Sequence, residues 1–266
     1  MDLIDVREVR VARSRADVIF APGERPLGGG TWLYSEPQPG TTGLVDLTSL
    51  GWEPVSETPD AVVIAATCTI ETLRGLTDSA LFQQCADSLL ASWKIQHIAT
   101  VGGNICLALP AGSMTALAVA LDATALVWAA PGVDGSPGLD RRVPVADLVT
   151  GVQRTSLLPG EVLRAIELPK YALAARTAFR RIALSPLGRT ATLVTGRVDD
   201  SGTAVFGITG GTERPHQLRF DELPSEPALA SAVDAITDWY DDAHGSTDWR
   251  RAMSLRFALE IARELS

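Results

Sequence analysis

The feature that most constrains the fold is a change in the sequence pattern after Pro169. Upstream of this proline, short strands and helices alternate between many glycines and prolines, whereas downstream a block of strands precedes a block of helices. Strands followed by helices are typical of an α+β unit with its own core. We therefore expect two domains, covering residues 1–170 and 176–266, with a boundary near residues 170–176.

The downstream block shows this order clearly. Its strand-like runs cover residues 179–184, 191–198 and 203–208. The turn at residues 199–202, Asp-Asp-Ser-Gly, predicts a hairpin between the last two runs. Ser225 and Thr247 are predicted N-caps of two helices. The apolar face of the first helix holds Leu229, Val233, Ile236 and Tyr240.

The upstream block contains three runs that predict buried strands, at residues 61–66, 126–128 and 162–168. Thr69 is placed to cap a short helix, with Glu71 in its first turn. Longer helices are predicted over residues 79–93 and 114–121.

Composition excludes several classes of protein. The 266 residues carry a net charge of −9, which argues against nucleic-acid binding because such binding needs a basic surface. Three scattered cysteines, Cys68, Cys85 and Cys106, are too few for a disulfide framework. We expect no secretory signal, and no apolar run approaches the ~18 residues of a membrane-spanning helix. A cytoplasmic protein without a membrane span is predicted.

Two glycine-rich segments are the strongest local signals for chemistry. They are residues 26–32, Pro-Leu-Gly-Gly-Gly-Thr-Trp, and residues 99–104, Ala-Thr-Val-Gly-Gly-Asn. Consecutive glycines let several backbone N–H groups turn towards a phosphate, so two such turns could hold a pyrophosphate from both sides. An isolated Gly-Gly pair is more often an ordinary tight turn.

Other site motifs are absent from the sequence. There is neither a G-x-G-x-x-G fingerprint nor a P-loop, and no serine lies in a G-x-S-x-G elbow. His97, His216 and His244 lie far apart and have no ligand-spaced partners, so surface or capping roles are the favoured interpretation. The six tryptophans are interpreted as core anchors. The residues thus indicate a nucleotide-type cofactor binder without its own acid–base machinery.

An ordered set of motifs resembles the FAD-binding medium subunit of molybdenum hydroxylases, the family of xanthine dehydrogenase and carbon monoxide dehydrogenase. Residues 27–33, L-G-G-G-T-W-L, match a family loop of the form A-G-G-x-[ST]-[DE]-L. Residues 99–104 match [AT]-[ST]-[IV]-G-G-N, and residues 116–122, A-L-A-V-A-L-D, look like the family's L-x-A-L-D-A helix. The strand at residues 162–168 and the tail from Trp249 onwards are also similar.

This resemblance implies a fold and a cofactor. The fold would be α+β, with a two-lobed PCMH-type FAD-binding domain and a C-terminal domain of the CO dehydrogenase flavoprotein type. Backbone N–H groups of both glycine segments would hold the FAD pyrophosphate. The implied contacts are Leu27, Gly28, Gly29, Gly30, Thr31 and Trp32, then Thr100, Val101, Gly102, Gly103 and Asn104, with Leu90 and Leu163 lining the flavin, Arg180 near its ring and Ser113 near FAD hydroxyls. Ser113 and Trp32 replace acidic residues of the family pattern.

The resemblance also implies a role. The chain would be an electron-transfer subunit that receives electrons from the [2Fe–2S] clusters of a small partner and serves a large molybdopterin subunit, in a dimer of heterotrimers. No catalytic residue and no metal are expected in this chain. Two alternatives stay open: a stand-alone FAD oxidoreductase with its own small substrate, and a scaffold that has lost FAD. The second is suggested by Ser113 and Trp32, which replace acidic residues of the family pattern.

Overall fold

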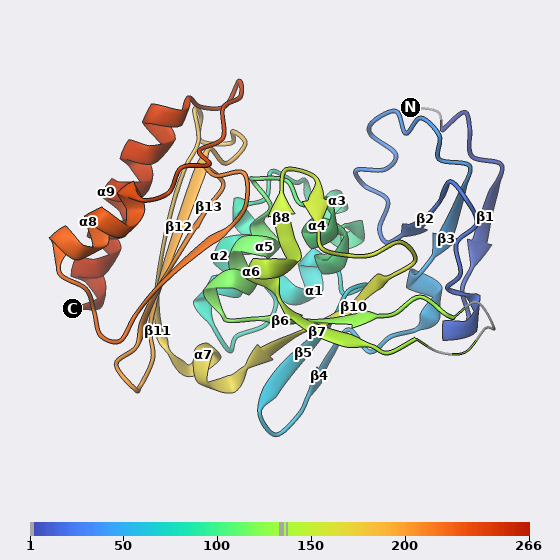
Figure 1. The fold of residues 1–266 in the computed structure, drawn as a ribbon, viewed down its shortest axis with the longest axis horizontal. Helices are drawn as coiled ribbons and strands as arrows, with labels where there is room; N and C mark the ends of the chain where they lie inside the picture. The colour runs from blue at the N-terminus through green and yellow to red at the C-terminus, as the bar shows by residue number, and fades with distance from the viewer. Residues whose placement is uncertain (1–2, 133–135, 137) are drawn as a thin grey trace.

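The computed structural model describes residues 3–132, 136 and 138–266, and their fold is α+β. A small parallel sheet near the N-terminus adjoins a helical centre lying on an antiparallel sheet (Figure 1). A second antiparallel sheet, covered on its outer side by two helices, forms the other end of the molecule (Figure 1).

The N-terminal sheet positions the first glycine segment. Its central strand β3 (Gly43–Asp46) pairs in parallel with β1 (Glu8–Val11) and with β2 (Glu24–Leu27). Because Leu27 is the last residue of β2 and pairs with Asp46, the glycines that follow leave the sheet at this end.

The central sheet is antiparallel throughout and confirms the three strands predicted upstream. Its order is β4 (Val55–Glu57), β5 (Ala61–Ala65), β10 (Val162–Pro169), β6 (Thr124–Trp128) and β7 (Arg141–Pro144). A short ladder joins β8 (Val149–Gly151) to β9 (Arg154–Thr155). The helices here are α1 (Ile70–Arg74), α2 (Ala80–Ser88), α3 (Trp93–Ile98), α4 (Val101–Leu107), α5 (Ser113–Ala120), α6 (Val145–Leu148) and α7 (Lys170–Ala174).

Helix α5 is fully buried at the centre of the molecule. All eight of its residues are buried, and it contributes Met114, Leu117 and Val119 to the main core. It also contacts the strands β12 (Thr192–Val198) and β13 (Ala204–Thr209) of the second antiparallel sheet. A helix that is apolar all round belongs inside a larger core rather than on a surface.

The C-terminal sheet has two different faces. Its order is β11 (Arg176–Ile182), β12, β13 and β14 (His216–Phe220), which confirms the predicted strands and the hairpin turn at residues 199–202. One face packs on α8 (Glu226–Asp234) and α9 (Thr247–Leu265) around Val194, Phe206 and Phe257. The opposite face lies on α5, as Figure 1 shows. The proposed domain boundary near residues 170–176 stays a prediction.

Three local predictions are wrong in detail. The helix expected over residues 79–93 ends at Ser88, because Leu89 is extended and Ser92 caps a separate helix, α3. Helix α8 ends at Asp234, so Ile236 and Tyr240 lie beyond it, and the Tyr240 N–H instead donates to Gly211 O at 2.9 Å. The last helix is capped by Ser246, not by Thr247.

The caps at Thr69 and Ser225 are confirmed, each accepting a hydrogen bond from a backbone N–H of the first turn. The predicted core role of Trp93 is wrong, since it is 66% exposed. In the part of the chain that the structure describes, no helix has the length and apolar character needed to cross a membrane.

Candidate functional site

The two glycine-rich segments meet in the structure, although about 70 residues separate them in the chain. A Cβ atom on Gly29 would lie 1.7 Å from the carbonyl oxygen of Ile98, and one on Gly28 would lie 2.7 Å from Thr100 Oγ1. Only glycine permits the backbone approach at Gly29, because the obstructing atom is itself backbone. The expectation that the two segments come together is therefore confirmed.

The first segment presents a row of free donors. Gly30 has a φ of +70°, and its carbonyl accepts the Tyr34 N–H at 2.9 Å, which closes a tight turn. Within the described residues, the N–H groups from Gly29 to Trp32 donate to no protein acceptor. Successive free N–H groups in a turn form a concave site for an anion. This arrangement suits a phosphate held by backbone alone.

The second segment is the start of a helix and not the predicted turn. Thr100 is the N-cap of α4, and its Oγ1 accepts the Gly103 N–H at 3.1 Å. Gly102 lies against the preceding strand, where a Cβ atom would be 2.5 Å from Ala66 Cβ. The glycine at this position therefore allows α4 to pack closely on the residues that follow β5.

The first donors of α4 are already used inside the protein. The N–H groups of Val101, Gly102 and Gly103 donate to Cys68 O, Ala66 O and Thr100 Oγ1 at 2.9, 2.8 and 3.1 Å. The prediction that this segment offers free N–H groups is wrong for that reason. Of the three bonds, only that of Gly103 involves a side chain, and Gly103 is exposed, so rotation of Thr100 would release this donor.

Asn104 connects the second segment to α5. Its Oδ1 accepts the Met114 N–H at 3.0 Å and so satisfies one of the first donors of α5. The neighbouring Ser113 is 1% exposed, and its hydroxyl has no hydrogen-bond partner among the described residues. A buried hydroxyl without a partner costs free energy, so this oxygen is available to a ligand or a water molecule.

The remaining predicted contacts are scattered. Leu90 follows α2 and is 61% exposed. Leu163 is 3% exposed and belongs to the main core, where β10 pairs with β6. Arg180 pairs with Glu264 at 2.6 Å and with Glu260 at 3.4 Å on α9, so it lies on the outer face of the C-terminal sheet.

Arg181 and Thr190 lie near these contacts, although neither is among the predicted FAD contacts. Arg181 follows Arg180 on β11 and therefore points to the inner face, where its Nε donates to Thr190 Oγ1 at 2.6 Å. Thr190 Oγ1 in turn donates to Ser88 O at 3.2 Å, two residues before Leu90. Strand alternation could have separated the two arginines, but the sequence alone did not say which face carries helices.

Residues 9–171 match the family described as the FAD binding domain in molybdopterin dehydrogenase, which covers more than half of the chain. The chain belongs to this family. Its cofactor is therefore FAD, and the chain is an FAD-binding oxidoreductase component of the molybdenum hydroxylase type. The resemblance based on the two glycine segments is confirmed at the level of the family.

Known proteins of this type share nearly the whole chain. The carbon monoxide dehydrogenase medium chain of Afipia carboxidovorans is 28% identical, over 90% of this chain and 88% of that one. A structure of reconstituted CO dehydrogenase from Oligotropha carboxidovorans matches with a TM-score of 0.82 and 25% identity, over 97% and 98% of the chains. Quinoline 2-oxidoreductase from Pseudomonas putida 86, at 22% identity and a TM-score of 0.77 over 97% of each chain, shares the fold.

The residues present fit a dinucleotide cofactor. The free N–H groups from Gly29 to Trp32 suit its diphosphate, and the unpartnered Ser113 hydroxyl suits a polar group of the ligand.

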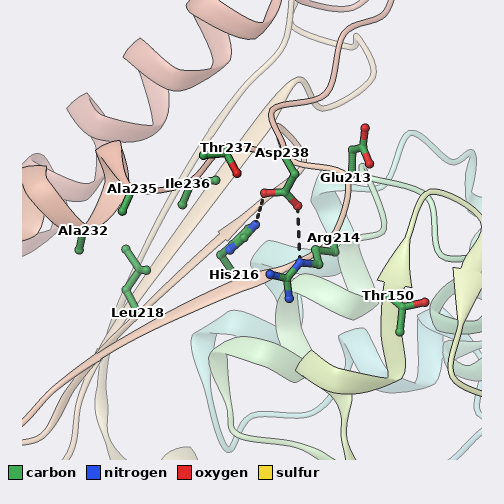
Figure 2. A pocket seen from close by; sticks show the side chains of 10 residues that line it. All are labelled: Thr150, Glu213, Arg214, His216, Leu218, Ala232, Ala235, Ile236, Thr237 and Asp238. Atoms are coloured by element: carbon green, nitrogen blue, oxygen red, sulfur yellow. Dashed lines mark hydrogen bonds and ion pairs between the residues drawn. The ribbon is translucent and has the colours of Figure 1, made fainter.

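A separate cavity of about 450 Å³ lies at the other edge of the C-terminal sheet (Figure 2). His216 Nε2 lies 2.6 Å from Asp238 Oδ1, and Arg214 Nε lies 3.6 Å from Asp238 Oδ2 (Figure 2). Burial lowers the pKa of His216, and the Asp238 carboxylate opposes this shift. The predicted surface or capping role of His216 is wrong, since its side chain is 15% exposed and paired. None of the residues lining this cavity is a predicted FAD contact.

Proposed function

We propose that this chain is the electron-transfer flavoprotein subunit of a molybdenum hydroxylase complex in the cytoplasm. Electrons would come from the [2Fe–2S] clusters of a small partner subunit, after substrate oxidation in a large molybdopterin subunit, and leave to an external acceptor. The complex would be a dimer of heterotrimers. Similarity to the CO dehydrogenase medium chain over most of both chains supports this assembly.

One observation carries the cofactor part of the proposal. The free N–H groups from Gly29 to Trp32 lie in a turn whose glycines pack against Ile98 and Thr100. Backbone donors held rigidly in this way bind a phosphate without the conformational cost of ordering long side chains. The turn is therefore the proposed seat of the FAD diphosphate.

Other contacts of the proposed site are assigned from their exposure and bonding. Gly103 would add its N–H group once Thr100 rotates, and Asn104 would keep α5 in place through Met114. The Ser113 hydroxyl would bond a polar group of FAD, and the exposed Leu90 would contact the flavin ring. Leu163 and Arg180 are left out, because the first is in the core and the second is paired with α9.

The cysteines of this chain support a division of labour between subunits. FAD supplies one-electron and two-electron chemistry when it is bound. Burial raises the pKa of Cys68 and of Cys106 to about 12, so both thiols stay protonated at neutral pH and are poor ligands for iron. Within the described residues, no three His, Cys, Asp or Glu side chains are grouped to hold a metal ion. Free thiols, of which Cys68 and Cys85 are buried, also suit the reducing cytoplasm.

One added methyl group at Gly29 tests whether the turn holds FAD. Gly29→Ala should lower FAD affinity by at least about tenfold, because the new Cβ would meet Ile98 O and force the turn away from its packed position. Affinity is measured by titrating the cofactor-free chain with FAD and following flavin fluorescence.

Gly75→Ala is the matched control, since it makes the same change at the C-cap of α1. Its φ of −76° suits alanine, and the new Cβ would be 3.4 Å from Thr72 O, an ordinary contact. Equal FAD affinity in the Gly29→Ala and Gly75→Ala variants would show that the turn does not hold the cofactor. A wild-type chain that binds no FAD would favour the scaffold alternative, and one that oxidises a small substrate without partners would favour the stand-alone enzyme.

A further inference from the structure

Asp122 joins three separate parts of the chain. It lies two residues beyond the last residue of α5, with a φ of +52°, and its carboxylate accepts hydrogen bonds from four side chains. The donors are Tyr171 at 2.8 Å, Arg197 at 2.5 Å, Gln217 at 2.6 Å and Arg219 at 2.6 Å. Three of these four donors lie on β12 and β14, so a single carboxylate connects the end of α5 to the C-terminal sheet.

Arg197 makes this connection rigid. It is fully buried, and its guanidinium also donates to Ala120 O at 2.7 Å and to Asp199 Oδ1 at 2.7 Å. Gln217 adds a bond to Val119 O at 2.8 Å. The carbonyl groups at the end of α5, which lack partners within their own helix, are thus bonded by side chains of the opposing sheet.

Helix α5 and strand β12 both extend from the contacts of Asp122 and Arg197 towards the candidate site. Helix α5 extends about 12 Å from Ala120, two residues before Asp122, back to Ser113, at about 1.5 Å per residue. Strand β12 extends roughly 17 Å from Arg197 to Thr192, at about 3.3 Å per residue. Two residues further, the Thr190 hydroxyl donates a hydrogen bond to Ser88 O, near Leu90. A shift of the C-terminal sheet on α5 would therefore move Thr190 and the Ser88 backbone that it contacts, next to Leu90.

We propose that Asp122 is a positioning residue for the flavin site: its carboxylate locks the C-terminal sheet onto α5 and thereby fixes the segment at Thr190 beside Ser88. Asp122 contacts no cofactor and acts through these two elements. The flavin part of this inference rests on the proposed function, whereas the contact between sheet and helix does not.

The test uses the full-length chain and two variants. Asp122→Asn removes the charge of the carboxylate and keeps its shape. Arg219→Gln removes one of the bonds to Asp122 and changes only a half-exposed side chain. This second variant provides a folded protein to measure if Asp122→Asn does not fold. Both should speed FAD dissociation, Asp122→Asn by roughly tenfold, within the range typical of coupling between two sites. Both should also change the visible circular dichroism of bound flavin.

Two controls separate positioning from general stability. Asp234→Asn makes the same change at an exposed carboxylate that pairs with Arg251 at 3.1 Å. Val233→Ala makes a cavity in the core beneath α8 without touching the clamp, which is the Asp122 carboxylate with its donors Tyr171, Arg197, Gln217 and Arg219. Both controls should keep the wild-type FAD dissociation rate and flavin spectrum, although Val233→Ala lowers the melting temperature.

Hydrogen exchange measured on the cofactor-free chain tests the contact between the C-terminal sheet and α5 without FAD. In Asp122→Asn and Arg219→Gln, amides of β12, β14 and the end of α5 should exchange faster, whereas those of β5 and β10 should not. Unchanged exchange in these segments would overturn the clamp whether or not FAD binds. Faster exchange with an unaltered flavin spectrum and dissociation rate would overturn its positioning role.

Discussion

The buried hydroxyl of Ser113 has no protein partner, and Thr115 on the same helix shares this property. Both side chains are almost fully buried in α5, yet only Ser113 lies at the end of the helix that Asn104 contacts. An unsatisfied buried hydroxyl destabilises the chain unless a ligand or water completes it. The two residues therefore form a natural pair for a test of cofactor contact.

Ser113→Ala should leave the cofactor-free chain as stable as the wild type or stabilise it by up to about 1 kcal/mol, because the unsatisfied group is gone. The same change should weaken FAD binding by roughly two- to tenfold if the hydroxyl bonds the cofactor. Thermal unfolding with and without FAD measures both effects.

Thr115→Val is the control, with a similar effect on the free chain and none on FAD affinity. If Ser113→Ala binds FAD as tightly as the wild type does, the hydroxyl is not a cofactor contact.

At the scale of elements, β11 places two neighbouring arginines on opposite faces of the C-terminal sheet. Arg180 pairs with glutamates of α9, whereas Arg181 bonds Thr190 and the Gly188 carbonyl near Ser88. The basic residue predicted near the flavin was Arg180, and the structure instead puts Arg181 on the inner face.

Arg180→Gln should cost less than about 1 kcal/mol of stability and should not change FAD affinity, since it removes partly exposed ion pairs on the far face. Arg181→Gln should weaken FAD binding, because Thr190 loses the guanidinium that holds it beside Ser88. The two affinities are compared by fluorescence titration. The reverse order of effects would restore Arg180 as the flavin-side arginine.

Elements with local signals were predictable from the sequence. The strand runs, the hairpin turn and the caps at Thr69 and Ser225 depend on nearby residues, and each has its expected counterpart. The end of α2 was missed because no glycine or proline marks Leu89. The helical start at Thr100 was missed because paired glycines disfavour helices, and tertiary packing of Gly102 on Ala66 overrides that preference.

At the scale of the whole molecule, contacts distant in sequence decide the site. The meeting of Gly29 with Ile98, and of Asp122 with β12 and β14, depends on how sheets and helices stack. No local pattern encodes such stacking. The resemblance to a family supplied the cofactor and the grouping of the glycine segments, but not which N–H groups are free.

Acid should lower the free energy of unfolding of the protein, because it protonates Asp122. Burial alone would raise the pKa of this carboxyl, but bonds from Arg219 and Arg197 outweigh it and lower the pKa to about 2. Because the folded value lies below the usual 3.8, the stabilisation is fully present above about pH 4 and is lost as pH falls towards about 2.

The free energy of unfolding of wild type and Asp122→Asn, measured by denaturant titration, should therefore converge between about pH 4 and about pH 2. A gap between the two proteins that stays constant over this interval would mean that Asp122 does not titrate as the clamp requires.

The close approach of Gly29 to Ile98 has a consequence for how such chains diverge. Any side chain at this position collides with backbone, so the fold retains the glycine even after the loss of a cofactor. The side chains of Thr31 and Trp32 meet no such restriction, being only partly buried in the turn. In a lineage that abandoned flavin, substitutions would accumulate first at Thr31 and Trp32, and the glycines would outlast the function they once served.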